Sequence, residues 1–393
     1  MGDLPLLKEL GFDVSDEATN RRAQETVVVG MSGGVDSSVT ALLTKLLGYR
    51  TIGVFMKNWE EAEGGECTAE ADWLDARRVA GELDIPIYSV NFSEQYREQV
   101  FATFLSEYRA GHTPNPDILC NREIKFKVFS DYATMLGAHY VATGHYCRTE
   151  NGKLLKGLDA GKDQSYFLHA ITGDVLKKVL FPVGHLPKKT VRELAARFEL
   201  ATSEKKDSTG VCFIGERDFK EFLSQYIETS KGSFVDLNGK VLGPHDGVCF
   251  YTHGQRKGLG VGGPGEPWFV AKKNIAKNEV VLVQGEQHPA LYCDGLTAIE
   301  STWIGGDTPE FPLRCKAKVR YRQQDQDCLV TRDGDVLTVL FDVPQRAVTP
   351  RQSVVFYQGE VCLGGAVILE ASPSYFDLGA ALPALPLGLD SNP

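Results

Sequence analysis

Apolar runs alternate with amphipathic segments over the first 150 residues. Four short runs rich in β-branched and other apolar residues predict buried strands at 26–29, 51–56, 85–92 and 139–143. Helical spacing of apolar positions predicts helices at 37–47, 69–84 and 93–110, and another that begins in the proline-bearing segment 113–126. Strands that alternate with helices predict an α/β fold with a doubly wound parallel sheet, in which ligands bind beyond the carboxyl ends of the strands.

The pattern changes at about residue 232. Before this point, helical patterns continue at 164–171, 190–200 and 218–227. After it, short β-type runs lie between turn residues, at 235–241, 248–251, 268–271, 280–283, 296–303, 313–322, 328–332, 335–342, 353–358 and 361–369. Turn residues at intervals of about 8–12 positions are typical of an all-β barrel or sandwich.

These patterns divide the chain into five expected parts. They are an N-terminal extension at 1–24 with a short helix at 4–10, an α/β domain at 25–217, a small mixed or β central domain at 218–287, a β-barrel at 288–372, and a disordered tail at 373–393.

Composition favours a globular protein without a membrane partner. Of 393 residues, 42% are hydrophobic and 24% are charged, and no run approaches the roughly 20 apolar residues of a membrane span. The acidic N-terminus is neither a secretory signal nor an Arg-rich transit peptide, so we expect a cytoplasmic location. The net charge of −10 argues against a non-specific nucleic-acid coat, and binding to RNA would need local basic patches.

The stretch TVVVGMSGGVDSS at 26–38 joins a predicted strand to a predicted helix through a glycine turn. Glycines let the backbone approach an anion, and the start of a helix favours negative charge. Asp36 lies among these donors, where it could hold Mg²⁺ on phosphates. The stretch lacks the lysine of G-x-x-x-x-G-K-[ST] and resembles instead the SGGxDS loop of ATP pyrophosphatases, which cleave ATP between its α and β phosphates. The alternative is a plain glycine turn.

Two of the nine cysteines lie in polar loops rather than in apolar runs. Cys120 follows Asp117 near the start of a predicted helix, whose dipole lowers a thiol pKa, and Cys212 follows a lysine pair. Asp117 is a candidate acid/base, and a turn or cap is an equally good reading. The count is odd and no Cys-x-x-Cys occurs, so we expect mostly reduced thiols. Buried, inert thiols are expected at Cys147, Cys249, Cys315, Cys328 and Cys362.

Nearly the whole chain, from about 26 to 369, resembles the tRNA-specific 2-thiouridylases. The motifs that carry the resemblance are GMSGGVDSS (30–38), FMKNW (55–59), TPNPDILCNREIKF (113–126), ATGHY (142–146), KDQSYFL (162–168), KKDSTGVCFIGERDF (205–219), GQRKGLG (254–260), VRYR (319–322) and EVCLGG (360–365). The resemblance implies an adenine-nucleotide alpha-hydrolase-like domain that converts the wobble uridine at position 34 of tRNA to 2-thiouridine.

The resemblance also implies a role for individual residues. The residues that would bind ATP are Gly30, Met31, Ser32, Gly33, Gly34, Val35, Asp36, Ser37, Met56 and Gly144. By this resemblance, the target base is bound by Asn115, Pro116 and Asp117. Further contacts with tRNA are made by His145, Lys162, Asp163, Gln164, Arg320, Tyr321 and Gln352. Cys120 becomes the nucleophile or resolving thiol, and Cys212 the persulfide carrier. One position departs from the family pattern, because the family's glycine before Gln352 is Arg351 here.

The implied chemistry has two halves. ATP, with Mg²⁺, adenylates the C2 oxygen of uracil and so makes it a leaving group. A Cys212 persulfide then supplies the sulfur. Its terminal sulfur attacks C2 directly, or Cys120 attacks the persulfide, closes a Cys120–Cys212 disulfide and releases hydrosulfide that attacks C2. In another route, Cys120 first bonds to C2 itself. Expected partners are tRNAs for Lys, Glu and Gln, and a cysteine desulfurase or a sulfur-relay protein as donor.

Basic segments could hold the tRNA backbone. Five cations alternate over 314–322, so that one strand would direct them to one face; they are Arg314, Lys316, Lys318, Arg320 and Arg322. A second basic region comprises Lys177, Lys178, Lys188, Lys189, Arg192, Arg197, Lys205 and Lys206. The glycine-rich stretch 253–265 could pack on RNA, or it could be a long β connection.

Two other classes of function remain open from sequence. One is another ATP pyrophosphatase, such as a synthetase for a small molecule or a different tRNA thiolase. The other is a non-catalytic ATP- or RNA-binding module. The polar surroundings of Cys120 and Cys212 favour a thiolase, because a small-molecule synthetase has no use for the two thiols and a binding module would leave their surroundings incidental.

Overall fold

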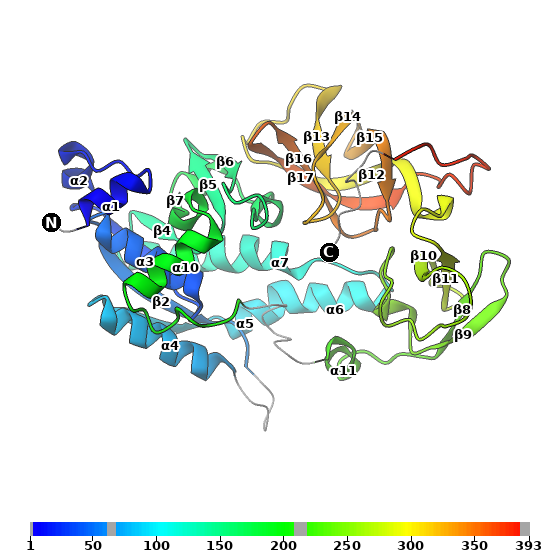
Figure 1. Ribbon diagram of the computed structural model, residues 1–393, viewed down its shortest axis with the longest axis horizontal. Coiled ribbons are helices and arrows are strands. Elements are labelled where there is room, and N and C mark those ends of the chain that lie inside the picture. Colours follow the sequence, from blue (N-terminus) through cyan, green and yellow to red (C-terminus); the bar gives the residue numbers. More distant parts are fainter. Residues whose placement is uncertain (1–2, 61–67, 208–217, 386–393) are drawn as a thin grey trace.

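The computed structural model of the chain describes residues 3–60, 68–207 and 218–385. An α/β domain lies on one side of the molecule, and a β-barrel and a smaller sheet lie on the other (Figure 1). Cys212 and the other residues outside these ranges are not described. Among the described residues, none of the helices combines the length and the apolar character that crossing a membrane demands.

A five-stranded parallel sheet forms the centre of the α/β domain. Its order is β3-β2-β1-β4-β7, with β1 (Thr26–Gly30), β2 (Arg50–Lys57), β3 (Ile87–Asn91), β4 (Tyr140–Ala142) and β7 (Val179–Leu180). Val27 and Val29 of β1 join one hydrophobic cluster, and Val28 between them joins another. Because strand side chains alternate between faces, both faces of the sheet are covered, as a doubly wound fold requires.

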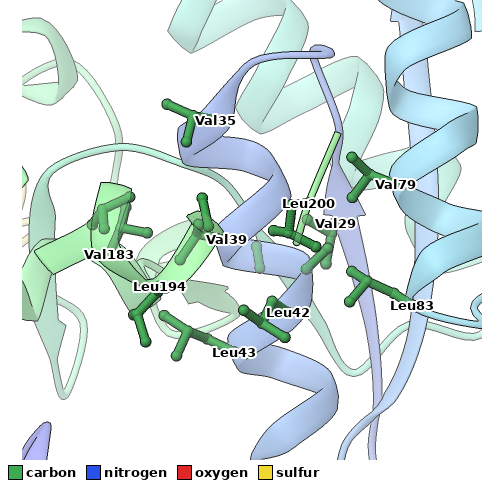
Figure 2. Close-up of a cluster of buried hydrophobic side chains, with 14 of the residues drawn as sticks. Val29, Val35, Val39, Leu42, Leu43, Val79, Leu83, Val183, Leu194 and Leu200 are labelled. Carbon is green, nitrogen blue, oxygen red and sulfur yellow. The ribbon is translucent and has the colours of Figure 1, made fainter. Parts of the chain in front are cut away.

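Helices from different parts of the chain cover the first face. They are α1 (Leu4–Glu9), α3 (Val35–Leu46), α4 (Thr68–Glu82) and α10 (Lys188–Arg197). Figure 2 shows Val39, Leu42 and Leu43 of α3 packed between the sheet and neighbouring helices. The N-terminal extension therefore belongs to this core, because Leu6 and Leu7 of α1 are buried in it. A second short helix that the sequence did not reveal, α2 (Asp16–Arg22), is capped by Ser15.

Two long helical stretches cover the other face. The first consists of α5 (Ser93–Tyr96), the π-helical η1 (Arg97–Phe101) and α6 (Ala102–Arg109). The second consists of α7 (Pro116–Leu119), the π-helical η2 (Cys120–Val128) and α8 (Phe129–Met135). Helix α11 (Phe219–Ser224) buries Phe222 and Leu223 in the hydrophobic cluster on this face, the one that Val28 joins.

A hairpin from the α/β domain extends the barrel. The barrel strands are β12 (Tyr292–Trp303), β13 (Leu313–Lys318), β14 (Gln326–Asp333), β15 (Val336–Arg346), β16 (Ser353–Gln358) and β17 (Val361–Ala371). Pairing between β12 and β17 closes the barrel. The hairpin of β5 (Cys147–Glu150) and β6 (Lys153–Lys156), absent from the sequence prediction, pairs with β17. One sheet therefore connects the α/β domain to the barrel.

The central domain is a four-stranded sheet in the order β10-β11-β8-β9. Its strands are β8 (Gly232–Val235), β9 (Val241–His245), β10 (Trp268–Asn274) and β11 (Glu279–Gln284). Phe234, Val270 and Leu282 are fully or almost fully buried between the sheet and the segment that follows β9.

Short elements complete the described chain. They are η3 (Ser165–Leu168), α9 (Gly173–Leu176), η4 (Pro182–His185), η5 (Val248–Phe250) and η6 (Pro289–Leu291).

Four predicted segments differ from the structure. The run 235–241 is the turn between β8 and β9, because its Asp-Leu-Asn-Gly core closes a hairpin. The run 248–251 is a 3-10 turn, and 164–171 contains one 3-10 turn rather than a helix. The described part of the tail, at 373–385, differs from the expected disorder, because Tyr375, Leu382 and Leu385 pack on apolar side chains of the central sheet and β12.

Candidate functional site

The glycine turn ends β1 and starts α3. The N–H of Ser32 donates to Oγ of Ser37 over 3.1 Å, and that hydroxyl donates to the carbonyl of Gly34 over 3.0 Å. The loop is thus closed on the first turn of α3, which begins at Val35 without a side-chain cap from Gly34. Uncapped N–H groups at the start of a twelve-residue helix attract an anion, so the predicted phosphate loop has the expected geometry.

Two glycines are required by close backbone contacts. Gly33 has φ +74°, and a Cβ there would lie 2.3 Å from the carbonyl oxygen of Asp72 in α4. A Cβ on Gly144 would lie 2.9 Å from the backbone N of Ser37. Met56 is also near the loop, since its methyl group lies 3.2 Å from the Cβ position of Gly30. The structure therefore brings Gly144 and Met56 to the loop, as predicted from sequence.

Met31 and Val35 have buried side chains that belong to the core. Only their backbone can face a nucleotide. Gly30, the first residue of the loop, likewise offers backbone alone.

A lysine from a distant segment reaches the phosphate loop. Nζ of Lys188, the first residue of α10, lies 2.7 and 2.9 Å from the carboxylate oxygens of Asp36. The hydroxyl of Tyr146 donates to the same carboxylate over 2.7 Å. The Lys188 side chain is only 13% exposed. Lys188 of α10 therefore brings a positive charge to the loop, a contact that the sequence did not predict.

Asp207 connects this lysine to two further cations. Its carboxylate lies 2.8 Å from Nζ of Lys188, 2.9 Å from Nζ of Lys162 and 2.6 Å from Arg192. Burial acts to raise the pKa of Asp207, but the hydrogen bonds from Lys188 and Lys162 outweigh it and hold that pKa well below its usual range. Asp207 is the last described residue before the segment that carries Cys212.

The second basic region is partly paired with carboxylates within the protein, and its contact with RNA stays a prediction. Five of its eight members pair with carboxylates. Lys188 and Arg192 meet Asp207, and Lys205 pairs with Asp72 and Asp75 of α4. On the surface, Lys177 pairs with Asp174 and Lys189 with Glu193. Lys189 points outward with 87% exposure. A sequence shows where cations cluster along the chain, but it does not show the acidic partners that the fold supplies.

Cys120 lies on a rigid, buried helix turn. Asn115 caps α7, because its side-chain oxygen accepts the N–H of Asp117 over 3.1 Å, and Pro116 occupies the first turn. The capping role thus belongs to Asn115 rather than to Asp117. Cys120 is 3% exposed and lies one turn further on, where the π-helical η2 begins.

Asp117 is half-buried. Its burial raises the pKa of the carboxyl group, against a smaller lowering by the charge of Lys125. A carboxyl that holds its proton longer than usual suits an exchange with the N3 position of uracil. The acid/base role of Asp117 stays a prediction.

His145, Asp163 and Gln164 bind other protein groups. Nδ1 of His145 lies 2.7 Å from the hydroxyl of Thr143, and burial lowers the pKa of this histidine well below its usual value. Asp163 accepts the N–H groups of Gly157 and Ser165, and Gln164 accepts the N–H of Tyr146. These bonds shape the loop after β4, and the predicted tRNA contacts of the three residues stay predictions.

The five alternating cations do not share one face. Strand β13 ends at Lys318, so Arg320 and Arg322 lie in the turn beyond it. Lys318 is 8% exposed and lies 3.6 Å from the carboxylate of Asp163. Arg320 donates to the carbonyls of His253 and Ala347. Arg314, Lys316 and Arg322 are exposed, and two of them pair with carboxylates: Arg314 with Asp342 and Lys316 with Asp327. The alternation was read correctly, but it was extended past the end of the strand.

Three of the predicted tRNA residues lie where the barrel meets the α/β domain; they are Lys162, Tyr321 and Gln352. Tyr321 packs on Phe167 with ring centres 4.5 Å apart, and its hydroxyl lies 3.5 Å from the carbonyl of Lys162. The side chain of Gln352 donates to the carbonyl of Thr113. The barrel therefore contacts the two segments that flank the candidate site.

The glycine-rich stretch after His253 borders a hollow of about 320 Å³. Arg256, Gly258 and Trp268 are among the residues that line it. Its position beside β10 fits either reading made from sequence, a long β connection or a loop that packs on RNA.

Three family models match consecutive parts of the chain. The tRNA methyl transferase HUP domain matches residues 25–216, the tRNA methyl transferase PRC-barrel domain matches 220–284, and the aminomethyltransferase beta-barrel domain matches 293–368.

Curated proteins match over most of the chain. A tRNA-specific 2-thiouridylase MnmA of Protochlamydia amoebophila is 55% identical over 92% of this chain and 97% of its own length. One of Pseudomonas fluorescens is 53% identical over 91% and 98%. Among solved structures, the U34-tRNA thiolase NcsA of Methanococcus maripaludis is 18% identical, covering 56% of this chain and 68% of that one, with a TM-score of 0.36. This last likeness is too distant to bear on function.

Proposed function

Because the chain belongs to the tRNA-specific 2-thiouridylases, we propose that its site adenylates the C2 oxygen of the wobble uridine of tRNA and replaces that oxygen with sulfur. The family match fixes the class of enzyme, an ATP-using tRNA sulfurtransferase. One observation in the structure carries the ATP half: Lys188 and Tyr146 converge on Asp36 beside an uncapped helix start.

The loop and the lysine suit cleavage between the α and β phosphates. The N–H groups of the loop and the α3 start can bind the pyrophosphate oxygens, and Lys188 adds a positive charge next to them. Charge that develops on the leaving pyrophosphate is then met by donors that are already in place, so little reorganisation is needed during the reaction.

The proposal includes Mg²⁺ on the phosphates. Asp36 offers a carboxylate, and the hydroxyls of Ser32 and Ser37 lie within 3.2 Å of each other in the same loop. Oxygen ligands of this kind, together with phosphates and water, are what Mg²⁺ prefers. When bound, the ion would neutralise charge on the phosphates.

The sulfur half rests on Asp117 and the two cysteines. Asn115, Pro116 and Asp117 would meet the base, and Asp117 would exchange the N3 proton. Cys212 would carry the persulfide, and Cys120 would act as the second thiol, either by bonding to C2 or by releasing hydrosulfide. A Cys120–Cys212 disulfide formed in the second route is reset by thiol exchange.

The partners of the reaction belong to the same proposal. The substrates are tRNAs for Lys, Glu and Gln, whose position 34 lies in a single-stranded loop from which a base can be turned into a pocket. The sulfur comes from a cysteine desulfurase or a relay protein, and the reaction takes place in the cytoplasm.

Nucleoside mass spectrometry tests the proposal. The protein is incubated with unmodified tRNA, Mg-ATP and a sulfide source, and the digest is compared with 2-thiouridine and 4-thiouridine standards. We expect 2-thiouridine that maps to position 34, together with AMP and pyrophosphate. A 4-thio product, or thiolation at another position, would contradict it.

Cysteine variants separate the two halves. With a protein persulfide donor in place of sulfide, C120S and C212S should abolish thiolation while ATP binding is kept. Cys293 is a matched control, because it is buried in the barrel and donates its S–H to the carbonyl of Gly295. C293S should thiolate like the wild type. Activity retained in C120S and C212S would remove the sulfur half and leave an ATP pyrophosphatase.

A further inference from the structure

Arg351 occupies a backbone position that favours glycine. Its φ is +69°, in the left-handed region. A side chain in this region costs about 1–2 kcal/mol, because Cβ crowds the following carbonyl. The N–H of Arg351 bonds to the carbonyl of Ile368, so the turn that leads into β16 holds this conformation. An arginine that accepts this cost is expected to gain a contact that glycine cannot make.

The side chain of Arg351 joins two domains. One guanidinium nitrogen bonds to the carboxylate of Glu107 in α6, and the other lies 3.7 Å from the carboxylate of Glu300 in β12. The Arg351 and Glu107 side chains are 24% and 17% exposed, so water screens their pair less than it screens a surface pair. Arg351 thus links the barrel to the long helix of the α/β domain.

The same contact borders the loop that carries the proposed base-binding residues. Glu107 also lies 2.8 Å from Nδ1 of His112, through its second oxygen. The residue after Arg351, Gln352, donates to the carbonyl of Thr113. Two adjacent barrel residues therefore hold the chain at 107–113, immediately before Asn115.

We propose that Arg351 is a positioning residue that fixes the loop 112–117 against the barrel, so that the target uridine meets this loop in a single geometry. The inference rests on the proposed function. Arg351 acts through Glu107 and touches none of the reacting atoms. A small displacement of a bound substrate is enough to lower the rate of its reaction, while much of its binding energy is kept. The ion pair between Arg351 and Glu107 should therefore affect kcat for thiolation more than the affinity for tRNA.

The first test replaces Arg351 by glycine, which adopts a positive φ without strain. In R351G the positive φ is no longer strained, so the fold should be retained and ATP should bind as in the wild type. We expect kcat for thiolation to fall about tenfold and KM for tRNA to stay within about threefold. R351K should recover part of kcat, since a lysine keeps the charge but reaches only one carboxylate at a time.

A double-mutant cycle tests the route through Glu107. E107Q should lower kcat like R351G, and the double variant should be no worse than either one. R332A is the control, because Arg332 lies on the exposed β14–β15 hairpin and pairs only with neighbours there. R332A should leave both constants unchanged. If R351G fails to fold, R351K and E107Q still carry the comparison.

The outcomes are distinct. A rise in KM with unchanged kcat would mean that Arg351 contacts tRNA directly, and it would overturn the inference. Additive effects of R351G and E107Q, or no effect of either, would also overturn it. A wild-type protein that makes no 2-thiouridine would instead refute the proposed function.

Discussion

Replacement of Lys188 by methionine probes the part of the site that the fold alone assembles. The change keeps the length of the side chain and removes its charge. In the structure, Nζ of Lys188 contacts both oxygens of Asp36 and one of Asp207. Lys188→Met therefore leaves Asp36 with the hydroxyl of Tyr146, while Asp207 keeps Lys162 and Arg192.

Two magnitudes follow from these contacts. Loss of one preorganised charge donor at a site where negative charge develops costs about 10²–10³ in rate, or about 3–4 kcal/mol. Loss of charged hydrogen bonds to a half-buried Asp36 costs about 1–3 kcal/mol of folding stability. The effect on rate should exceed what partial unfolding could produce, because a folded protein tolerates a loss of this size.

Lys189 provides a matched control. It is the next residue of the same helix, but its side chain is 87% exposed and its pairing with Glu193 spans 3.6 Å. Lys189→Met removes the same charge from the same segment without touching the loop. Pyrophosphate release in the presence of tRNA and ATP measures the rate, and urea unfolding measures stability separately.

The two variants together test whether the contact of Lys188 with Asp36, rather than the general charge of α10, supports the reaction. We expect Lys188→Met to lose at least about 100-fold in pyrophosphate release, and Lys189→Met to lose less than about threefold. Equal losses would mean that the general charge of α10 matters rather than the contact with Asp36. An active Lys188→Met protein would refute the role assigned to this lysine.

Three further changes test other parts of the structure. G144A should weaken ATP binding at least about tenfold in calorimetry, because the added Cβ meets the backbone of Ser37 at 2.9 Å, whereas G81A, with open space around it, should not. Burial acts to raise the pKa of Glu107, but the hydrogen bonds from Arg351 and His112 outweigh it and lower that pKa from its usual value. The contribution of Glu107 to stability is therefore present at pH 7 and is lost as the pH falls through the folded-state pKa. Urea unfolding of E107Q should show a deficit of about 1–2 kcal/mol at pH 7 that shrinks below about pH 4. Deletion of 373–393 should lower the melting temperature in calorimetry by at least about 3 °C, because apolar side chains packed on the central sheet are lost; an unchanged value would contradict this packing.

Local chemistry in the sequence was sufficient to predict the phosphate loop and the sheet. The β-branched run before Gly30 forms a strand in any context that buries it, and a glycine turn followed by a helix has few other geometries. Strand and helix alternation predicted the doubly wound sheet because parallel strands need crossovers. The loop after β1 and the approach of Gly144 followed from the rule that strand ends share one edge.

Only the tertiary structure decided how distant charges are paired. Lys188 and Lys318 were both counted as free cations, but the fold places carboxylates beside them. A sequence pattern reports the order of charges along the chain, whereas pairing depends on which elements the fold brings within a few ångströms. For the same reason the sequence did not predict the ion pair of Arg351, because its partner Glu107 lies in another domain, 244 residues away along the chain.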